Sequence, residues 1–125
     1  MASAFGYAEI IALSQSGIQA AEQAFLEDSS CILQASWFDA DRSPYLPNRV
    51  SYQLVDVESQ TVILPWASLG PATSNSVTVT SPQNAMINQT RGSETHKGIF
   101  QITDQNDTVF YAEVDFDIVR VAGLA

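Results

Sequence analysis

Residues 108–121 read TVFYAEVDFDIVRV, and this stretch decides the fold. Apolar side chains occupy every second position, namely Phe110, Ala112, Val114, Phe116 and Ile118. A tyrosine and three acidic residues stand between them. Successive side chains of a β-strand point to opposite faces, so this alternation predicts a long strand with one apolar wall and one acidic wall. Such a strand needs neighbours, which the remaining chain must supply.

Other stretches also have the composition of strands, with β-branched and aromatic residues between turn residues. They cover residues 30–38, 49–57, 61–68, 76–80 and 93–103. Only a short turn separates the second from the third, which favours an antiparallel hairpin. Pro65 places a bulge, a bend or a sheet edge within the third stretch. Ser81 and Pro82 predict a short helix before the fifth, with the serine as its cap.

Turn residues recur about every ten positions, a spacing typical of a β-sandwich. We therefore predict an all-β fold over residues 30–125, an antiparallel sandwich of immunoglobulin-like or fibronectin-like layout. The single cysteine, Cys31, cannot form an internal disulfide. We expect it to be a small buried strand residue.

The segment before this body has a different pattern. Residues 7–27 are rich in Ala, Gln and Glu, which favour a helix, and their apolar side chains recur at steps of three and four. The pattern predicts an N-terminal helix within residues 1–29, and an extended arm that orders on a partner is the alternative. The apolar side chains of this segment are the candidate partner-binding residues: Tyr7, Ile10, Ile11, Ile18 and Phe25.

The charge balance limits the classes of partner. Fourteen acidic residues against five basic ones give a net charge of −9. Binding to nucleic acid or to anionic lipid needs cations, so we expect neither a nucleic-acid partner nor a membrane partner. No apolar run approaches the ~20 residues that span a bilayer, and the N-terminus lacks the features of a signal peptide.

Few residues suggest chemistry. Asp39, Asp41, Asp56 and Glu58 could meet at one end of a sandwich and bind calcium, but no calcium-loop spacing is present, and we expect turn-forming acids. His96 has no marked nucleophile or orienting acid, so we expect a surface or edge histidine. The sequence therefore predicts no catalytic, cofactor-binding or metal-binding residues, no cofactor, and a protein that is not an enzyme.

The two tryptophans and the acids of the closing strand are expected to have structural roles. Trp37 and Trp66 lie in expected strands, and core packing is the first expectation for both. The acids of the closing strand are expected to form a solvated face or a recognition surface for a basic partner: Glu113, Asp115 and Asp117.

Several stretches carry a resemblance to a known group of proteins. They are ASWFDAD at 35–41, VSYQLVDVESQTVILPW at 50–66, VTVT at 77–80, NAMIN at 84–88, and residues 111–119 together with Lys97. Over about residues 30–121 the chain resembles small immunoglobulin-like proteins found among the structural genes of tailed bacteriophages. The resemblance implies a non-enzymatic virion protein, either a capsid decoration (cement) protein or a neck or tail accessory, and no catalytic residues.

The expected function follows from this resemblance. The sandwich would attach to the particle through its N-terminal segment, with copies of itself and major capsid, neck or tail proteins as partners. Its location would be the virion, assembled in the host cytoplasm. The alternative is a carbohydrate- or receptor-binding module of a host-attachment apparatus. That module would expose Trp37, Trp66, Tyr45 or Tyr52 in a concave groove.

Overall fold

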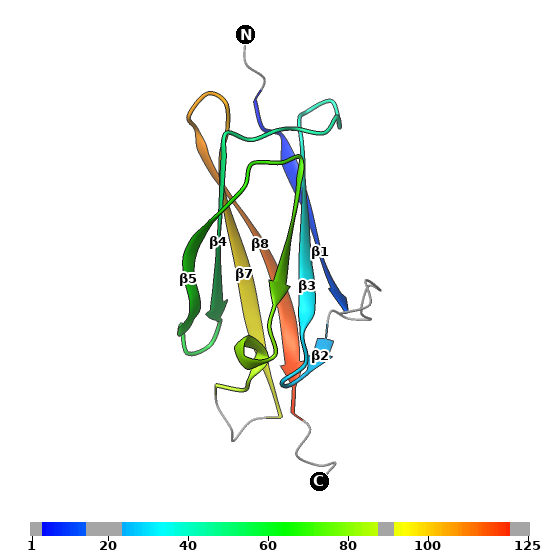
Figure 1. Ribbon diagram of the computed structural model, residues 1–125, viewed down its shortest axis with the longest axis vertical. Helices are drawn as coiled ribbons and strands as arrows, with labels where there is room; N and C mark the ends of the chain where they lie inside the picture. Colours follow the sequence, from blue (N-terminus) through cyan, green and yellow to red (C-terminus); the bar gives the residue numbers. More distant parts are fainter. Residues whose placement is uncertain (1–3, 15–23, 88–91, 121–125) are drawn as a thin grey trace.

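The computed structural model describes residues 4–14, 24–87 and 92–120, which form a sandwich of two β-sheets (Figure 1). The elements are β1 (Tyr7–Ser14), β2 (Ala24–Leu26), β3 (Cys31–Phe38), β4 (Arg49–Asp56), β5 (Val62–Leu69), β6 (Ser74–Val79), the 3-10 turn η2 (Pro82–Asn84), β7 (Ser93–Thr103) and β8 (Val109–Val119). The predicted all-β sandwich is confirmed.

The smaller sheet has the strand order β1-β3-β6 and the larger sheet the order β2-β8-β7-β4-β5. Neighbouring strands are antiparallel, except that β2 runs parallel to β8. The predicted hairpin of β4 and β5 is present. The strand with Pro65, which lacks an N–H for pairing, lies at the edge of the larger sheet, and the register with β4 shifts on both sides of Leu54.

The closing strand has the predicted two walls. β8 pairs along its whole length with β7, from Val109 opposite Thr103 to Val119 opposite Ser93. Val114, Phe116 and Ile118 are buried, while the alternate positions are exposed. The exposed wall carries the tyrosine and the three acids.

The core lies between the sheets around Trp37. Its ring meets Phe100 of the facing sheet at a centroid distance of 5.7 Å, and its indole Nε1 donates a hydrogen bond to Asn75 Oδ1 (2.9 Å). The core position predicted for Trp37 is therefore correct. The same expectation for Trp66 is wrong: this residue lies on edge strand β5, is 44% exposed and faces Tyr111.

The helix predicted over residues 7–27 is wrong in the described parts of that segment. β1 is a strand that pairs with β3, from Tyr7 opposite Phe38 to Ser14 opposite Cys31. β2 is a strand at the edge of the larger sheet. Main-chain pairing and burial of Ala12 against the core outweigh the modest helix propensity of this composition. The described part of residues 1–29 thus contributes strands to both sheets.

The candidate partner-binding residues of this segment do not share one surface. Tyr7 stacks on Phe38 at 5.1 Å, and Ile10 is half-buried against the core. Phe25 is buried and meets Phe116 edge-on at 6.1 Å. Ile11 is 36% exposed, and Ile18 lies outside the described residues. Most of the described members therefore pack within the protein itself.

A glycine in β7 tests how tightly the two sheets pack. A Cβ atom at Gly98 would lie 2.7 Å from Cδ1 of Leu33 and 3.3 Å from Cε1 of Tyr52. We expect Gly98→Ala to lower the free energy of unfolding by about 1–3 kcal/mol through overpacking, as measured by urea denaturation. Gly92→Ala is the matched control, because its Cβ would meet no atom of the described residues within 4 Å. Equal effects of the two substitutions would contradict this description of the core.

Candidate functional site

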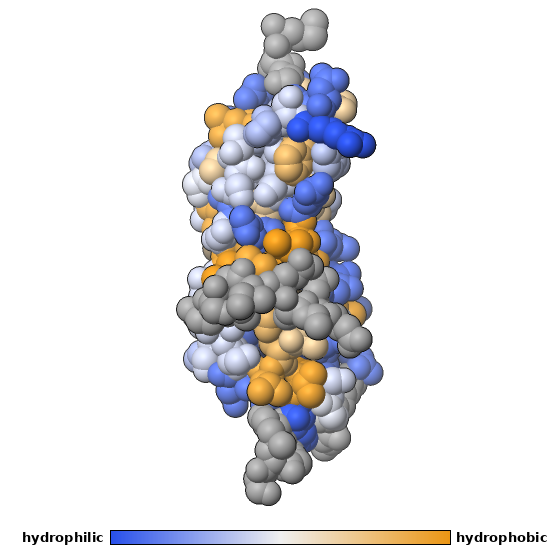
Figure 2. Space-filling view, turned by 90° about the vertical axis from the view of Figure 1, so that its right-hand side faces the viewer, coloured by the Kyte–Doolittle hydropathy of each residue, from blue (hydrophilic) through white to orange (hydrophobic). Residues whose placement is uncertain are grey.

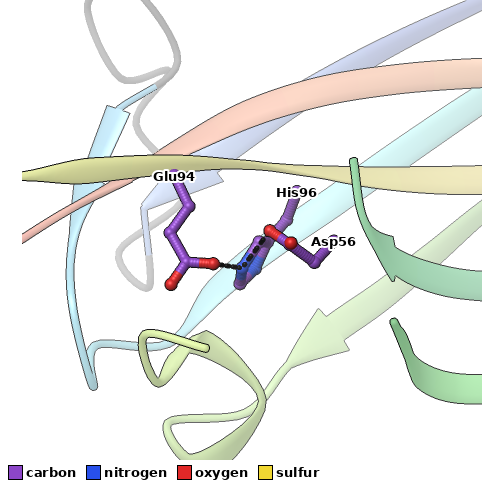
Figure 3. A group of neighbouring side chains, drawn as sticks. All are labelled: Asp56, Glu94 and His96. Atoms are coloured by element: carbon purple, nitrogen blue, oxygen red, sulfur yellow. Dashed lines mark ion pairs between the residues drawn. The ribbon is translucent and has the colours of Figure 1, made fainter. Parts of the chain in front are cut away.

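One group of buried polar side chains lies between the sheets: Asp56, Glu94 and His96 (Figure 3). Asp56 is the last residue of β4 and stands opposite His96 of β7, and Glu94 precedes His96 by two residues on the same strand face. The relative exposures of the three residues are 2%, 3% and 0%. The antiparallel pairing of β4 with β7 thus brings an imidazole and two carboxyl groups together at one end of the sandwich.

The strand period explains why these groups point inward. In β4 every second residue from Val50 to Asp56 is buried, and in β7 every second residue from Glu94 to Ile102 is buried. The polar residues continue the two apolar faces toward one end, so the backbone aims them into the core.

The two distances that join His96 to the carboxylates are longer than hydrogen bonds. His96 Nε2 lies 3.6 Å from Asp56 Oδ1 and 3.5 Å from Glu94 Oε2. A direct hydrogen bond from a ring nitrogen would measure about 2.7–3.2 Å. Within the described residues, Asp56 Oδ1 and both ring nitrogens of His96 have no hydrogen-bond partner. Buried polar atoms are normally satisfied, so these atoms make the group a candidate binding site.

Asp56 is held by its own turn. Its Oδ2 accepts hydrogen bonds from the amide N–H of Ser59 (2.9 Å) and from the Ser59 hydroxyl (2.6 Å). Burial alone would raise the pKa of Asp56, but these two hydrogen bonds, one with Glu94 and the charge of His96 together hold it below its usual value. One carboxylate oxygen is therefore fixed by the turn, while Oδ1 is turned toward His96.

Further polar groups occupy the same end of the core. Asn84 of η2 is fully buried; its Nδ2 donates to the carbonyl of Ser29 (2.7 Å) and lies 3.6 Å from Cys31 Sγ. Burial raises the pKa of the Cys31 thiol, and burial together with the nearby Cys31 raises the pKa of Tyr52. The buried position predicted for Cys31 is correct.

The four acids considered as calcium ligands do not come together, and two of them belong to a turn, as expected. The carboxylate of Asp39 accepts hydrogen bonds from the amides of Asp41 and Ser43 in its own loop. That loop follows the far end of β3, whereas Asp56 closes β4 at the opposite end of the sandwich (Figure 1). Only Asp56 of the four acids belongs to the buried group.

The expectation of a surface or edge histidine is wrong. His96 is fully buried in a strand with partners on both sides, and its ring packs edge-on against Phe116 at 5.9 Å. The signal was present in the sequence. Counting back in steps of two from Phe100 and Gly98, which lie on the apolar face, leads to His96 and then to Glu94.

Comparison with known proteins gives a fold but no family. No family model matches the chain, and no curated protein matches it. The soluble domain of PmoD from Methylocystis sp. is similar with a TM-score of 0.53 and 12% identity, covering 94% of this chain and 96% of that chain. CopC from Methylosinus trichosporium OB3b gives a TM-score of 0.49 and 13% identity, covering 90% and 96%. A superoxide reductase (neelaredoxin) from Ignicoccus hospitalis gives 0.49 and 9%, covering 91% and 81%.

The prediction of a bacteriophage virion structural protein is wrong, because the similar structure with a TM-score above 0.5, the soluble domain of PmoD, is not a virion protein. The alternative of a carbohydrate- or receptor-binding module is contradicted by the same comparison. Moreover, Trp37, Tyr45 and Tyr52, three of the four aromatic residues expected in its groove, are buried. In the part of the chain that the structure describes, no helix is long and apolar enough to cross a membrane.

The hydrogen bonds of Ser59 make stability depend on pH. Since the pKa of Asp56 is lower in the folded than in the unfolded chain, its ionised form stabilises the fold above the unfolded pKa, and this contribution is lost as the pH falls through the folded pKa. We expect Ser59→Ala to lower the free energy of unfolding by about 1–2 kcal/mol near neutral pH. The loss should shrink toward about pH 3 in urea denaturation of chelator-treated protein.

The control for this variant is Ser68→Ala, an exposed serine in β5. It should change stability little at either pH. A loss for Ser59→Ala that is the same at both pH values would show that the hydroxyl does not act through the charge of Asp56.

Proposed function

We propose that this protein binds a divalent metal ion of the zinc class through Asp56, Glu94 and His96. The observation that carries the proposal is the convergence of an imidazole and two carboxyl groups, with one donor atom of each within 4.8 Å of the others in a buried position. Buried charged groups are normally paired or coordinate a metal. Both ring nitrogens of the fully buried imidazole lack a hydrogen-bond partner among the described residues, which favours coordination.

The spacing of the donor atoms supports a shared ion. In a tetrahedral site with metal–ligand distances of about 2.0–2.2 Å, the ligand atoms lie roughly 3.3–3.6 Å apart. His96 Nε2 lies 3.6 Å and 3.5 Å from the two carboxylate oxygens. These separations are too long for direct hydrogen bonds and suit ligands of one small ion.

The donor set favours a particular class of ion. Calcium takes six to eight oxygen ligands, and magnesium prefers an octahedral shell of oxygens with several waters. One imidazole with two carboxylates suits zinc and its first-row neighbours, which accept nitrogen and oxygen in a four-coordinate shell. The three side chains leave one position for a further ligand.

We further propose that the ion has a structural role and that the protein is not an enzyme. His96 is 0% exposed and Glu94 only 3%, so a substrate has no access to these ligands. Asp56 borders a surface pocket of about 300 Å³ together with Val55 and Lys97, which gives an ion a short route to the carboxylate. An ion joining β4 to β7 would stabilise this end of the sandwich.

Metal titration of the full chain tests the proposal. After treatment with a chelator, Co²⁺ should produce the visible absorption of four-coordinate cobalt at one ion per chain, and Zn²⁺ should displace it. Zn²⁺ at a free concentration one hundred times its Kd should raise the free energy of unfolding by about 2.7 kcal/mol. Ca²⁺ should do neither, because it needs more oxygen ligands.

Single substitutions locate the ion. Glu94→Gln and His96→Gln should each lose the cobalt absorption and the stabilisation by zinc. Tyr52→Phe is the matched control, because it removes another buried polar atom from the same core, and it should bind as the wild type does. The proposal is wrong if the wild-type chain shows no visible absorption with Co²⁺ and gains no stability from Zn²⁺. In that case Asp56 and Glu94 form a hydrogen-bonded cluster that shares a proton.

A further inference from the structure

In the described parts of the chain, two strand edges on one side of the sandwich lack a paired strand over much of their length. β1 is the end strand of the smaller sheet, and within the described part of the chain it pairs with β3 alone. β8 pairs with β7 on one edge, whereas on its other edge β2 covers only Asp117 to Val119. Among the described residues, no strand therefore pairs with this edge of β8 from Val109 to Phe116. Open edges present unpaired N–H and C=O groups to an incoming chain.

Both open edges line the same groove. A groove of about 520 Å³ is lined by residues 5–8 and Ile10 on one side and by residues 111–113 of β8 on the other. Phe5 packs on Phe110 at a ring distance of 5.2 Å, next to these lining residues. At the other end of β8, β2 already lies beside the same edge. A strand placed in the groove would continue the line of β2 along β8.

The side chains around the groove define what would fit. Ile10 and Ala112, both half-buried, offer an apolar surface toward the gap between the sheets. Glu9, Glu113 and Asp115 are exposed on the outer faces of β1 and β8. Figure 2 looks onto the side of the molecule that carries β1 and shows apolar patches bordered by hydrophilic side chains.

The charge of the groove is incompletely balanced. Lys97 Nζ lies 3.4 Å from Glu113 and 3.9 Å from Asp115, so one cation serves two carboxylates. Opposite charges at facing positions of neighbouring strands stabilise a sheet, whereas like charges destabilise it. An incoming strand with basic residues on its outer face is therefore favoured.

From these observations we propose that β8 and β1 form a docking groove for an extended basic segment of a partner protein, which adds to β8 as a further strand. The segment alternates small apolar residues, facing Ile10 and Ala112, with Lys or Arg, facing Glu113 and Asp115. Main-chain hydrogen bonds supply affinity and the alternate side chains supply specificity in this type of recognition.

Charge argues against two other candidate occupants of the groove, a second copy of the chain and residues 15–23 of the chain itself. A second copy of the chain would bring its own net charge of −9 to an acidic edge. Residues 15–23 of the chain itself read QSGIQAAEQ and contain neither Lys nor Arg. A basic partner alone complements both the open edge and the carboxylates. The inference is independent of the metal proposal, because none of the three metal ligands lines the groove.

Synthetic peptides test the proposal by fluorescence anisotropy. The probe is a labelled octapeptide of alternating Lys and Val. A twin with the same side chains, N-methylated at alternate residues, cannot form one set of strand hydrogen bonds, and a third peptide replaces Lys by Glu. We expect the lysine peptide to bind at least tenfold more tightly than either of the others. Equal binding of the lysine peptide and its N-methylated twin would overturn strand addition.

A protein variant tests the charge. Glu113→Gln should weaken binding of the lysine peptide several-fold and reduce its salt dependence. Glu58→Gln is the matched control, since it removes the same charge from the exposed turn between β4 and β5. An equal loss in both variants would show that only the net charge matters and would overturn a specific groove.

Amide hydrogen exchange locates the bound peptide. Slower exchange of β8 amides between Val109 and Phe116 on adding the peptide supports the proposal. Protection of edge strand β5 instead, or full protection of this β8 edge in the free chain, would overturn it. Loss of that protection on dilution, together with a dimer in sedimentation, would assign the groove to a second copy.

Discussion

The pairing of β7 with β8 on one side and β4 on the other is the constraint on which the rest of the structure depends. These three strands share one inward face. On this face Phe100 and Ile102 are buried, and Phe100 packs against Trp37 of the other sheet. Because the register is continuous, the same pairing carries the polar residues at the start of β7 into the interior. The fold thus creates the core and the candidate site by one arrangement.

Much of the fold was predictable because strand periodicity is local. The alternation around Phe116 identifies β8. The missing N–H of Pro65 predicts a bulge, a bend or a sheet edge, and the structure places its strand at the edge. The helix prediction for the N-terminal segment was wrong because the composition favours a helix, whereas pairing with the distant strand β3 decides the structure. The core position predicted for Trp66 was wrong because the whole sheet decides which strand lies at its edge.

The inward orientation of the candidate site residues could be predicted from the sequence, but their convergence could not. Extending the apolar parity of β4 and β7 points Asp56, Glu94 and His96 inward, and this step needs no structure. Their convergence could not be predicted, because Asp56 and His96 are far apart in sequence and meet only through the β4–β7 register. The virion function was wrong because patterns such as alternating valines are shared by unrelated sandwiches.

The central claim is that Asp56, Glu94 and His96 share one metal ion. Its most direct test is an X-ray structure of the full chain crystallised with Zn²⁺, with anomalous scattering recorded at the zinc edge. The claim predicts an anomalous peak between β4 and β7, about 2.0–2.2 Å from a donor atom of each of the three side chains. Zinc sites confined to the surface, with a hydrogen bond joining His96 directly to Asp56 or Glu94, would contradict it.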